Sequence, residues 1–204
     1  MSISIYIGLI VLGYLLGSIP SAVLVARLWG KKDLRLEGDG HISATAVYRY
    51  CGKVPFVLTI ALDYGKGFLA IFLARPFIDS QLVLVLVAYA AVIGHCWSIF
   101  IRFTGGLGGV ILISVLAALA FKETLIGIGV CVIVLLATRK SSLATYTIQV
   151  AAAITLLIEK QSLVMIIFPL GLVLLHFLKR LQTQKNNPAT AYKHELFDDL
   201  KRSK

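Results

Sequence analysis

Charged residues and cysteines are scarce in this sequence, and each shortage excludes a class of protein. Only 15% of the 204 residues are charged, whereas 58% are hydrophobic. A soluble domain of this size would expose far more apolar surface than the few hundred Å² that monomers usually show. The three cysteines lie far apart and form no CxxC pair, so we expect neither a disulfide framework nor a zinc site. The sequence therefore predicts an integral membrane protein, and it implies no metal or cofactor.

Acidic residues are also few. The sequence contains ten Asp and Glu residues and twenty Lys and Arg residues, which gives a formal net charge of +10. Such an excess often indicates nucleic-acid binding, but here the basic residues lie in short gaps between apolar runs. That pattern is typical of membrane orientation and of contact with anionic headgroups. We therefore expect membrane lipids, and no nucleic acid, as partners.

Two further features are missing. The first apolar run, residues 3–29, has no basic n-region and exceeds the ~7–15 residues of a signal-peptide core, so we expect it to remain as a span. No internal repeat is evident, which disfavours a transporter built from paired halves.

The apolar runs predict an all-α bundle with about seven spans. A helix needs roughly 20 apolar residues to cross a bilayer, and fewer where the bilayer thins. The candidate spans are residues 3–25, 54–74, 82–101, 109–121, 125–137, 143–158 and 163–178. Only Lys122, Glu123 and Thr124 separate the fourth run from the fifth. This segment is either a tight hairpin, which we favour, or one broken helix with one crossing fewer.

The distribution of basic residues predicts the orientation. With the N-terminus outside, the outer gaps hold only Arg75, Lys122 and Lys160. The inner gaps then hold Arg27, Lys31, Lys32, Arg35, Arg49, Lys53, Arg102, Arg139 and Lys140. Because cytoplasmic loops are enriched in Lys and Arg, we expect an outside N-terminus and a cytoplasmic C-terminus. Residues 1–181 would form the membrane bundle and residues 182–204 a polar cytoplasmic tail, with a short amphipathic helix near residues 191–200.

Polar residues interrupt two of the runs. Asp63 and Lys66 lie three residues apart in the second run and so share one helix face. Charges inside a membrane are costly, which makes this pair a candidate site; mutual neutralisation that only packs the bundle is the alternative. The first run contains Gly17-Ser18-Ile19-Pro20-Ser21, where the proline predicts a kink.

The inner gap from Lys31 to Lys53 is long for so compact a protein. It contains Ser43 and Thr45 among small residues and ends near Arg49. Backbone N–H groups and a guanidinium suit a loop that wraps an anion. A simple connection is the alternative.

A glycine run follows the third span. Four glycines occupy the five positions from Gly105 to Gly109, close to Arg102 and after Gly94-His95. Where such a run opens a helix, its N–H groups and the positive helix end favour phosphate. A bare flexible turn, with His95 only capping or packing, fits the same residues.

Taken in order, these segments resemble the bacterial PlsY family, membrane glycerol-3-phosphate acyltransferases that use acyl phosphate as donor. The resemblance extends from the first span to about Leu181. It is carried by Leu16-Gly17-Ser18-Ile19-Pro20, Asp33-x-Arg35, Gly38-x-Gly40 with Ala44-Thr45 and Arg49, Leu62-Asp63 with Lys66-Gly67, Gly94-His95, and Phe103-x-Gly105-Gly106-x-Gly108.

The resemblance implies a multi-pass enzyme of the plasma membrane that makes lysophosphatidic acid from acyl phosphate and glycerol 3-phosphate in phospholipid biosynthesis, without a cofactor. Acyl phosphate is a mixed anhydride, so the enzyme mainly has to hold two phosphates and aim a hydroxyl at the acyl carbon. The catalytic candidates are Arg49, His95, Asp63 and Lys66. The substrate-binding candidates are Gly105, Gly106, Gly108, Ser43, Thr45, Ser142 and Arg35.

The chain departs from the family pattern in three segments. The loop that usually reads GSGNxGATN carries Asp39, His41, Ser43 and Ala46 instead. Thr104 and Leu107 replace the lysines of FKGGKG, and replacing a phosphate-facing ammonium by Leu removes a contact of about 1.5–3 kcal/mol. The closing HxxNxxRL pattern aligns with Leu174 and Phe177 before Arg180-Leu181, and His176 lies out of register. The alternative to an active enzyme is therefore a catalytically impaired paralogue that binds lipid or a phosphorylated ligand.

Overall fold

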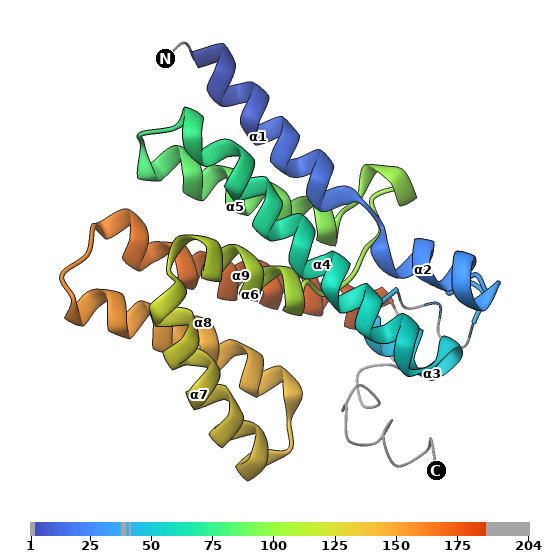
Figure 1. Ribbon diagram of the computed structural model, residues 1–204. Coiled ribbons are helices and arrows are strands. Elements are labelled where there is room, and N and C mark those ends of the chain that lie inside the picture. The colour runs from blue at the N-terminus through green and yellow to red at the C-terminus, as the bar shows by residue number, and fades with distance from the viewer. Residues whose placement is uncertain (1–2, 38–39, 41, 187–204) are drawn as a thin grey trace.

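The computed structural model describes residues 3–37, 40 and 42–186, and over these residues the chain is a bundle of α-helices (Figure 1). In chain order the helices are α1 (Ile3–Ser18), α2 (Ser21–Gly30), α3 (Ala44–Cys51), α4 (Lys53–Ala74), α5 (Gln81–Cys96), α6 (Gly109–Leu119), α7 (Phe121–Thr138), α8 (Ser141–Ile158) and α9 (Leu163–Asn186). Two short 3-10 turns, η1 (Arg75–Phe77) and η2 (Ile99–Ile101), follow α4 and α5. The predicted all-α class is confirmed.

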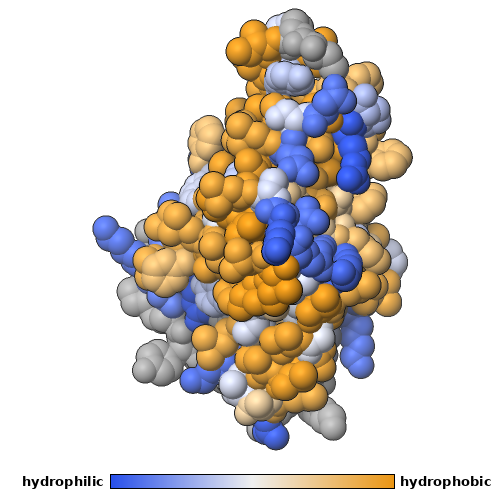
Figure 2. Space-filling model, turned by 90° about the vertical axis from the view of Figure 1, so that its left-hand side faces the viewer, coloured by the Kyte–Doolittle hydropathy of each residue, from blue (hydrophilic) through white to orange (hydrophobic). Residues whose placement is uncertain are grey.

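Four helical stretches are long and apolar enough to cross a membrane, namely Ile3–Gly30, Lys53–Phe77, Phe121–Thr138 and Leu163–Lys185. Three shorter apolar helices, Gln81–Cys96, Gly109–Leu119 and Leu143–Ile158, coincide with the remaining predicted runs. Large apolar side chains lie on the outer surface, and Figure 2 shows them covering much of one face between small hydrophilic patches. A surface of this kind is stable in lipid, because lipid tails solvate it.

Glycines allow the helices of the bundle centre to approach closely. α1 packs most extensively on α5, and a Cβ atom at Gly17 would overlap the backbone of Ala91. A Cβ atom at Gly94 would overlap the carbonyl oxygen of Tyr14. Small residues at such contacts are the usual means by which membrane helices pack, since the hydrophobic effect does not drive association inside a bilayer.

The first predicted span is broken rather than kinked. α1 ends at Ser18 and α2 begins at Ser21, because Pro20 has no N–H to continue the helix. The third run is helical only to Cys96, and the predicted extension to residue 101 is wrong, since Trp97 already leaves the helical conformation (φ −133°, ψ 69°).

The fourth and fifth runs are two helices, but the predicted turn at Lys122–Thr124 is wrong. The break lies at Ala120, whose φ of −142° and ψ of 69° are not helical, and the chain changes direction sharply there (Figure 1). Lys122, Glu123 and Thr124 instead form the first turn of α7. An acidic residue in a first turn is favourable, and the Thr124 hydroxyl donates to the Ala120 carbonyl at 2.7 Å.

Two other predicted boundaries differ from the structure. The gap between Lys31 and Lys53 is not all loop, since α3 occupies its second half. α9 continues to Asn186, five residues past the predicted end of the bundle at residue 181. The amphipathic helix predicted near residues 191–200 lies outside the described residues.

Candidate active site

A polar cavity of about 190 Å³ lies where the ends of α1, α2, α3, α5 and α6 meet the middle of α4. Drug-sized ligands occupy pockets of about 300–1,000 Å³, so this cavity suits a smaller ligand or a headgroup. Its walls contain both charged side chains and glycine backbone. Among the residues lining it are Ser18, Ser21, Ser43, Thr45, Asp63, Lys66, His95, Ser98, Gly105, Gly106, Leu107, Gly108 and Gly109.

The break between α1 and α2 forms one wall. A helix end leaves backbone carbonyls without partners, and here side chains from other helices satisfy two of them. The Lys66 ammonium of α4 donates to the Ile19 carbonyl at 2.7 Å. The Ser98 hydroxyl, just after α5, donates to the Ser18 carbonyl at 2.5 Å. Lys66 and Ser98 therefore hold the broken helix open at the cavity.

A buried charged group occupies the floor of the cavity. Lys66 Nζ lies 2.8 Å from Asp63 Oδ1, and His95 Nδ1 lies 3.5 Å from the same oxygen. Asp63 and Lys66 are 5% and 7% exposed. Both side chains also line the cavity, so the pair lies at the candidate site and its functional role stays a prediction.

The glycine turn that precedes α6 packs directly on the end of α5. A Cβ atom at Gly105 would overlap the carbonyl oxygen of His95, and one at Gly106 would lie 2.6 Å from His95 Nε2. Gly108 has a φ of +89°, which L side chains rarely adopt. Glycine is therefore favoured at all three positions, and the run forms a tightly packed turn rather than a flexible one.

Three helix N-termini converge on this cavity. The first residues of α2, α3 and α6 line it, namely Ser21, Ala44 and Gly109. Each helix start carries unpaired N–H groups and roughly half a positive charge. In α3 the Ser43 hydroxyl accepts from the Ala46 N–H at 3.1 Å. Because Asp63 offsets Lys66, these helix ends supply the positive potential that a phosphate requires.

Most of the predicted site residues meet at this cavity. Asp63, Lys66, His95, Ser43, Thr45, Gly105, Gly106 and Gly108 all line it. Leu107, where the family carries a lysine, lines it as well.

Three predicted residues lie elsewhere. Arg49 is exposed on the last turn of α3, where its guanidinium carbon lies 6.0 Å from the centroid of the Tyr50 ring. Ser142 belongs to the first turn of α8. Arg35 pairs with Asp33 at 2.6 Å, and Arg35 and Arg27 hold the pKa of the Asp33 carboxyl well below its usual value. Asp39 and His41 lie outside the described residues.

Sequence reasoning missed three serines of the site. Ser18 and Ser21 flank the predicted kink, and their position beside a helix break could have indicated that they belong to the site. Ser98 carried no signal, because its partner Ser18 lies 80 residues earlier in the chain.

A second, apolar cavity of about 520 Å³ lies between the α1–α2 segment and α4. Leu16, Leu24, Leu62, Phe68, Leu69 and Phe72 line most of it. Ile19, Ser21 and Lys66 line both cavities, so the apolar cavity adjoins the polar one. We refer to it as the apolar groove. Among the described residues, no cluster of three or more His, Cys, Asp or Glu is arranged to hold a metal ion.

Comparison with known proteins identifies the family of the chain. Residues 7–186 match the family Glycerol-3-phosphate acyltransferase. A glycerol-3-phosphate acyltransferase of Jannaschia sp. is 42% identical over 144 residues, which are 71% of this chain and 69% of the relative. That of Rubrobacter xylanophilus is 38% identical over 160 residues, 78% of this chain and 80% of the relative.

A solved structure shares the fold. The crystal structure of PlsY, an integral membrane glycerol 3-phosphate acyltransferase, in its glycerol 3-phosphate form superimposes with a TM-score of 0.80. It is 30% identical in sequence, and the match covers 93% of this chain and 94% of that chain. The lysophosphatidic acid form matches with a TM-score of 0.79 at 28% identity, over 94% and 98% of the two chains. The family resemblance and the membrane setting are thus confirmed, and the chain belongs to the glycerol-3-phosphate acyltransferase family.

Proposed function

We propose that this protein transfers a fatty acyl group from acyl phosphate to glycerol 3-phosphate, giving lysophosphatidic acid and inorganic phosphate for phospholipid synthesis. The convergence of the N-termini of α2, α3 and α6 on one polar cavity carries this proposal. Three positive helix ends favour an anion with several oxygens, and both substrates carry a phosphate.

The reaction needs positioning more than a nucleophilic side chain. The acceptor hydroxyl attacks the acyl carbon, the bond from that carbon to the phosphate oxygen breaks, and phosphate leaves with the electron pair and takes up the hydroxyl proton. The Gly105–Gly108 backbone and the helix ends hold the phosphates, while Lys66 faces the charge that develops on the leaving oxygen. His95, with Asp63 at one ring nitrogen and Gly106 against the other, orients the glycine turn.

The apolar groove holds the acyl chain of the donor. It adjoins the polar cavity at Ile19, Ser21 and Lys66, so a chain in the groove places its carboxyl end beside the phosphates. Phe68 and Phe72 line it and stack on one another at 6.4 Å between ring centroids.

This groove gives a prediction about chain length. Gly65 lines the groove, and no atom lies within 4 Å of a Cβ built there. Gly65→Phe should fill the groove beside Lys66 and shift the preference toward shorter acyl phosphates, because long chains lose their apolar contacts. Initial rates with a series of acyl phosphates of increasing length measure the shift. Gly129→Phe, on α7 and equally unobstructed, is the matched control, and an equal shift in both variants would refute the assignment.

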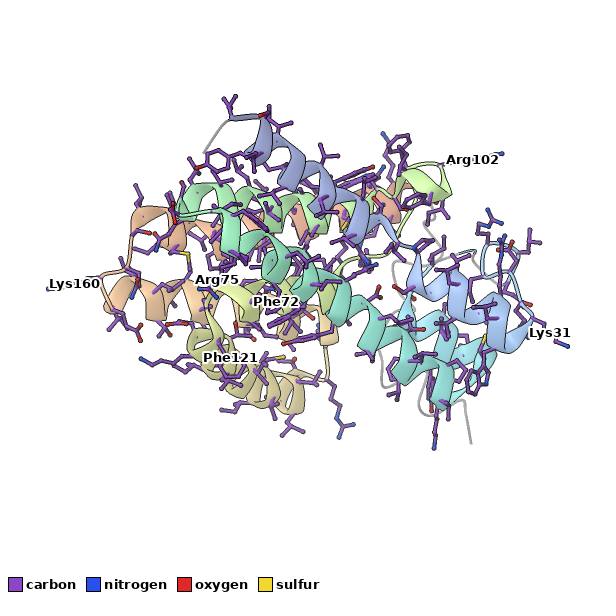
Figure 3. All side chains as sticks on the ribbon, turned by 45° about the horizontal axis from the view of Figure 1, so that its top comes forward. Lys31, Phe72, Arg75, Arg102, Phe121 and Lys160 are labelled. Carbon is purple, nitrogen blue, oxygen red and sulfur yellow. The ribbon has the colours of Figure 1, made fainter. Side chains whose placement is uncertain are left out.

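The protein crosses the membrane seven times in the plasma membrane of its cell, with the N-terminus outside and the cavity at the cytoplasmic face. Figure 3 supports this orientation, since Lys31 and Arg102 lie at one end of the bundle and Lys160 at the other. Single cysteines at Leu36 and Lys160 in a cysteine-free variant check it. A membrane-impermeant thiol reagent added outside intact cells should label position 160 and spare position 36; the reverse pattern would exclude this topology.

The activity itself is tested with purified protein in lipid nanodiscs. Acyl phosphate and glycerol 3-phosphate should yield lysophosphatidic acid and an equal amount of phosphate above a protein-free control. Folded protein that binds both substrates without product would favour the impaired paralogue. Arg49→Ala and Ser142→Ala belong in the same assay, because the predicted roles of these residues remain predictions.

A gain-of-function variant strengthens this test. Leu107 lines the polar cavity, so Leu107→Lys would add an ammonium that faces the bound phosphate. A charge-assisted hydrogen bond contributes about 1.5–3 kcal/mol, which corresponds to about a 10- to 100-fold lower KM for glycerol 3-phosphate. Leu107→Met controls for the change of shape. An unchanged or raised KM in the lysine variant would place the phosphate elsewhere.

A further inference from the structure

Ser18 carries a buried hydroxyl group and is one of the residues that line the polar cavity. Its side chain is fully buried, and its Oγ finds no hydrogen-bond partner among the described residues. Two buried threonine hydroxyls, by contrast, are satisfied within their own helices: Thr59 donates to the Pro55 carbonyl at 2.8 Å and Thr124 to the Ala120 carbonyl at 2.7 Å. Buried polar groups are nearly always paired in folded proteins, so the exception at Ser18 needs a reason.

The surroundings hold Ser18 in place without using its hydroxyl. Its backbone carbonyl accepts from Ser98 Oγ, and the carbonyl of the next residue, Ile19, accepts from Lys66. A Cβ atom at Gly94 would lie 2.9 Å from Ser18 Oγ, so the glycine leaves room for the serine side chain. The fold thus fixes the backbone of Ser18, which is one of the residues lining the polar cavity, and leaves its hydroxyl without a hydrogen-bond partner among the described residues.

The position of Ser18 indicates which ligand group it meets. Ser18 is the last residue of α1, where the helix dipole is negative. The positive helix ends belong to α2, α3 and α6. A phosphate therefore favours the helix N-termini, whereas a neutral hydroxyl can both accept from and donate to a serine at the negative end.

We infer that Ser18 Oγ hydrogen-bonds the secondary hydroxyl of the acceptor, the hydroxyl on C2 that does not react. This inference rests on the proposed function and assigns a specificity role within the same site. By hydrogen-bonding the C2 hydroxyl, Ser18 orients the primary hydroxyl toward the acyl carbon. The acceptor is thereby distinguished from phosphorylated alcohols that lack a neighbouring hydroxyl.

The test compares two acceptors in two proteins. Wild type and Ser18→Ala are assayed with glycerol 3-phosphate and with 3-hydroxypropyl phosphate, which lacks the C2 hydroxyl. Wild type should prefer glycerol 3-phosphate, and Ser18→Ala should lose about 3- to 10-fold in kcat/KM on that acceptor, the amount expected for a neutral hydrogen bond. Its kcat/KM for 3-hydroxypropyl phosphate should stay unchanged. Equal losses on both acceptors, or none, would overturn the inference.

Stability and phosphate binding separate this role from a structural one. The melting temperature of the ligand-free protein should not fall in Ser18→Ala, because the variant loses a buried hydroxyl that had no partner. Inorganic phosphate should raise the melting temperature of both proteins by the same amount. A smaller rise in Ser18→Ala would mean that Ser18 contacts the phosphate instead. Ser114→Ala is the control, since Ser114 is equally buried but donates to the Ile111 carbonyl at 3.0 Å. A wild type that binds and acylates neither acceptor would overturn the proposed function, and this inference with it.

Discussion

Gly105→Ala is expected to lower kcat/KM by more than about 100-fold. The added methyl group would overlap the carbonyl oxygens of His95 and Cys96, and these belong to the backbone, which cannot move aside as a side chain can. The glycine turn must shift away from α5, and with it the N–H groups at the start of α6. A displacement of 1 Å at a positioning group can cost a factor of about 10² in rate. Initial rates at saturating donor, with glycerol 3-phosphate varied, measure the effect.

Gly129→Ala provides the comparison. A Cβ atom there meets nothing within 4 Å, and Gly129 lies within α7, away from both cavities. We expect wild-type rates and a slightly higher melting temperature, since alanine is the better helix former. Comparable activity in the two variants would mean that the turn does not hold the substrate.

The second large effect is expected at the buried ion pair. Lys66→Met should destabilise the folded protein by about 3–5 kcal/mol, because it leaves the Asp63 carboxylate buried without its cation. It also frees the Ile19 carbonyl at the helix break. Chemical unfolding in detergent measures the loss, with product formation as a second readout.

Two companion variants separate stability from function. Lys122→Met removes a cation that pairs with Glu159 at 2.6 Å but is 70% exposed, so it should lower the stability far less than Lys66→Met does. Asp63→Leu combined with Lys66→Met removes both charges and should regain most of the stability. It should remain inactive, since no ammonium faces the leaving phosphate. An active double variant would contradict the role assigned to Lys66.

Features that depend on local sequence were predictable. The apolar runs located the membrane helices because hydrophobicity is read over a window of adjacent residues. Asp63 and Lys66 were found because two charges one helical turn apart are visible within a single run. The glycine turn was found because its residues are consecutive.

Features that depend on distant contacts were not predictable. Lys66 bonds a carbonyl 47 residues earlier in the chain, and no spacing rule links the two positions. The break at Ala120 has neither proline nor glycine to mark it. By contrast, the helix containing Arg49 was missed although Ser43 is a typical N-cap residue. Interpreting that segment as a loop missed that Arg49 lies in the last turn of α3 with an exposed side chain, and its role at the anion stays a prediction.

Under the proposed function, the apolar groove determines how the concentration of each substrate affects the reaction rate. Leu24, Leu62, Phe68 and Phe72, which line it, are 40–62% exposed on the outer surface of the bundle, so the groove opens sideways into the surrounding acyl chains. If the groove holds the acyl chain as proposed, the donor arrives by two-dimensional diffusion within one leaflet, and the lipid product departs by the same route without entering water. For the donor, the quantity that sets the rate is therefore its mole fraction in the bilayer, while the water-soluble acceptor obeys an ordinary bulk concentration.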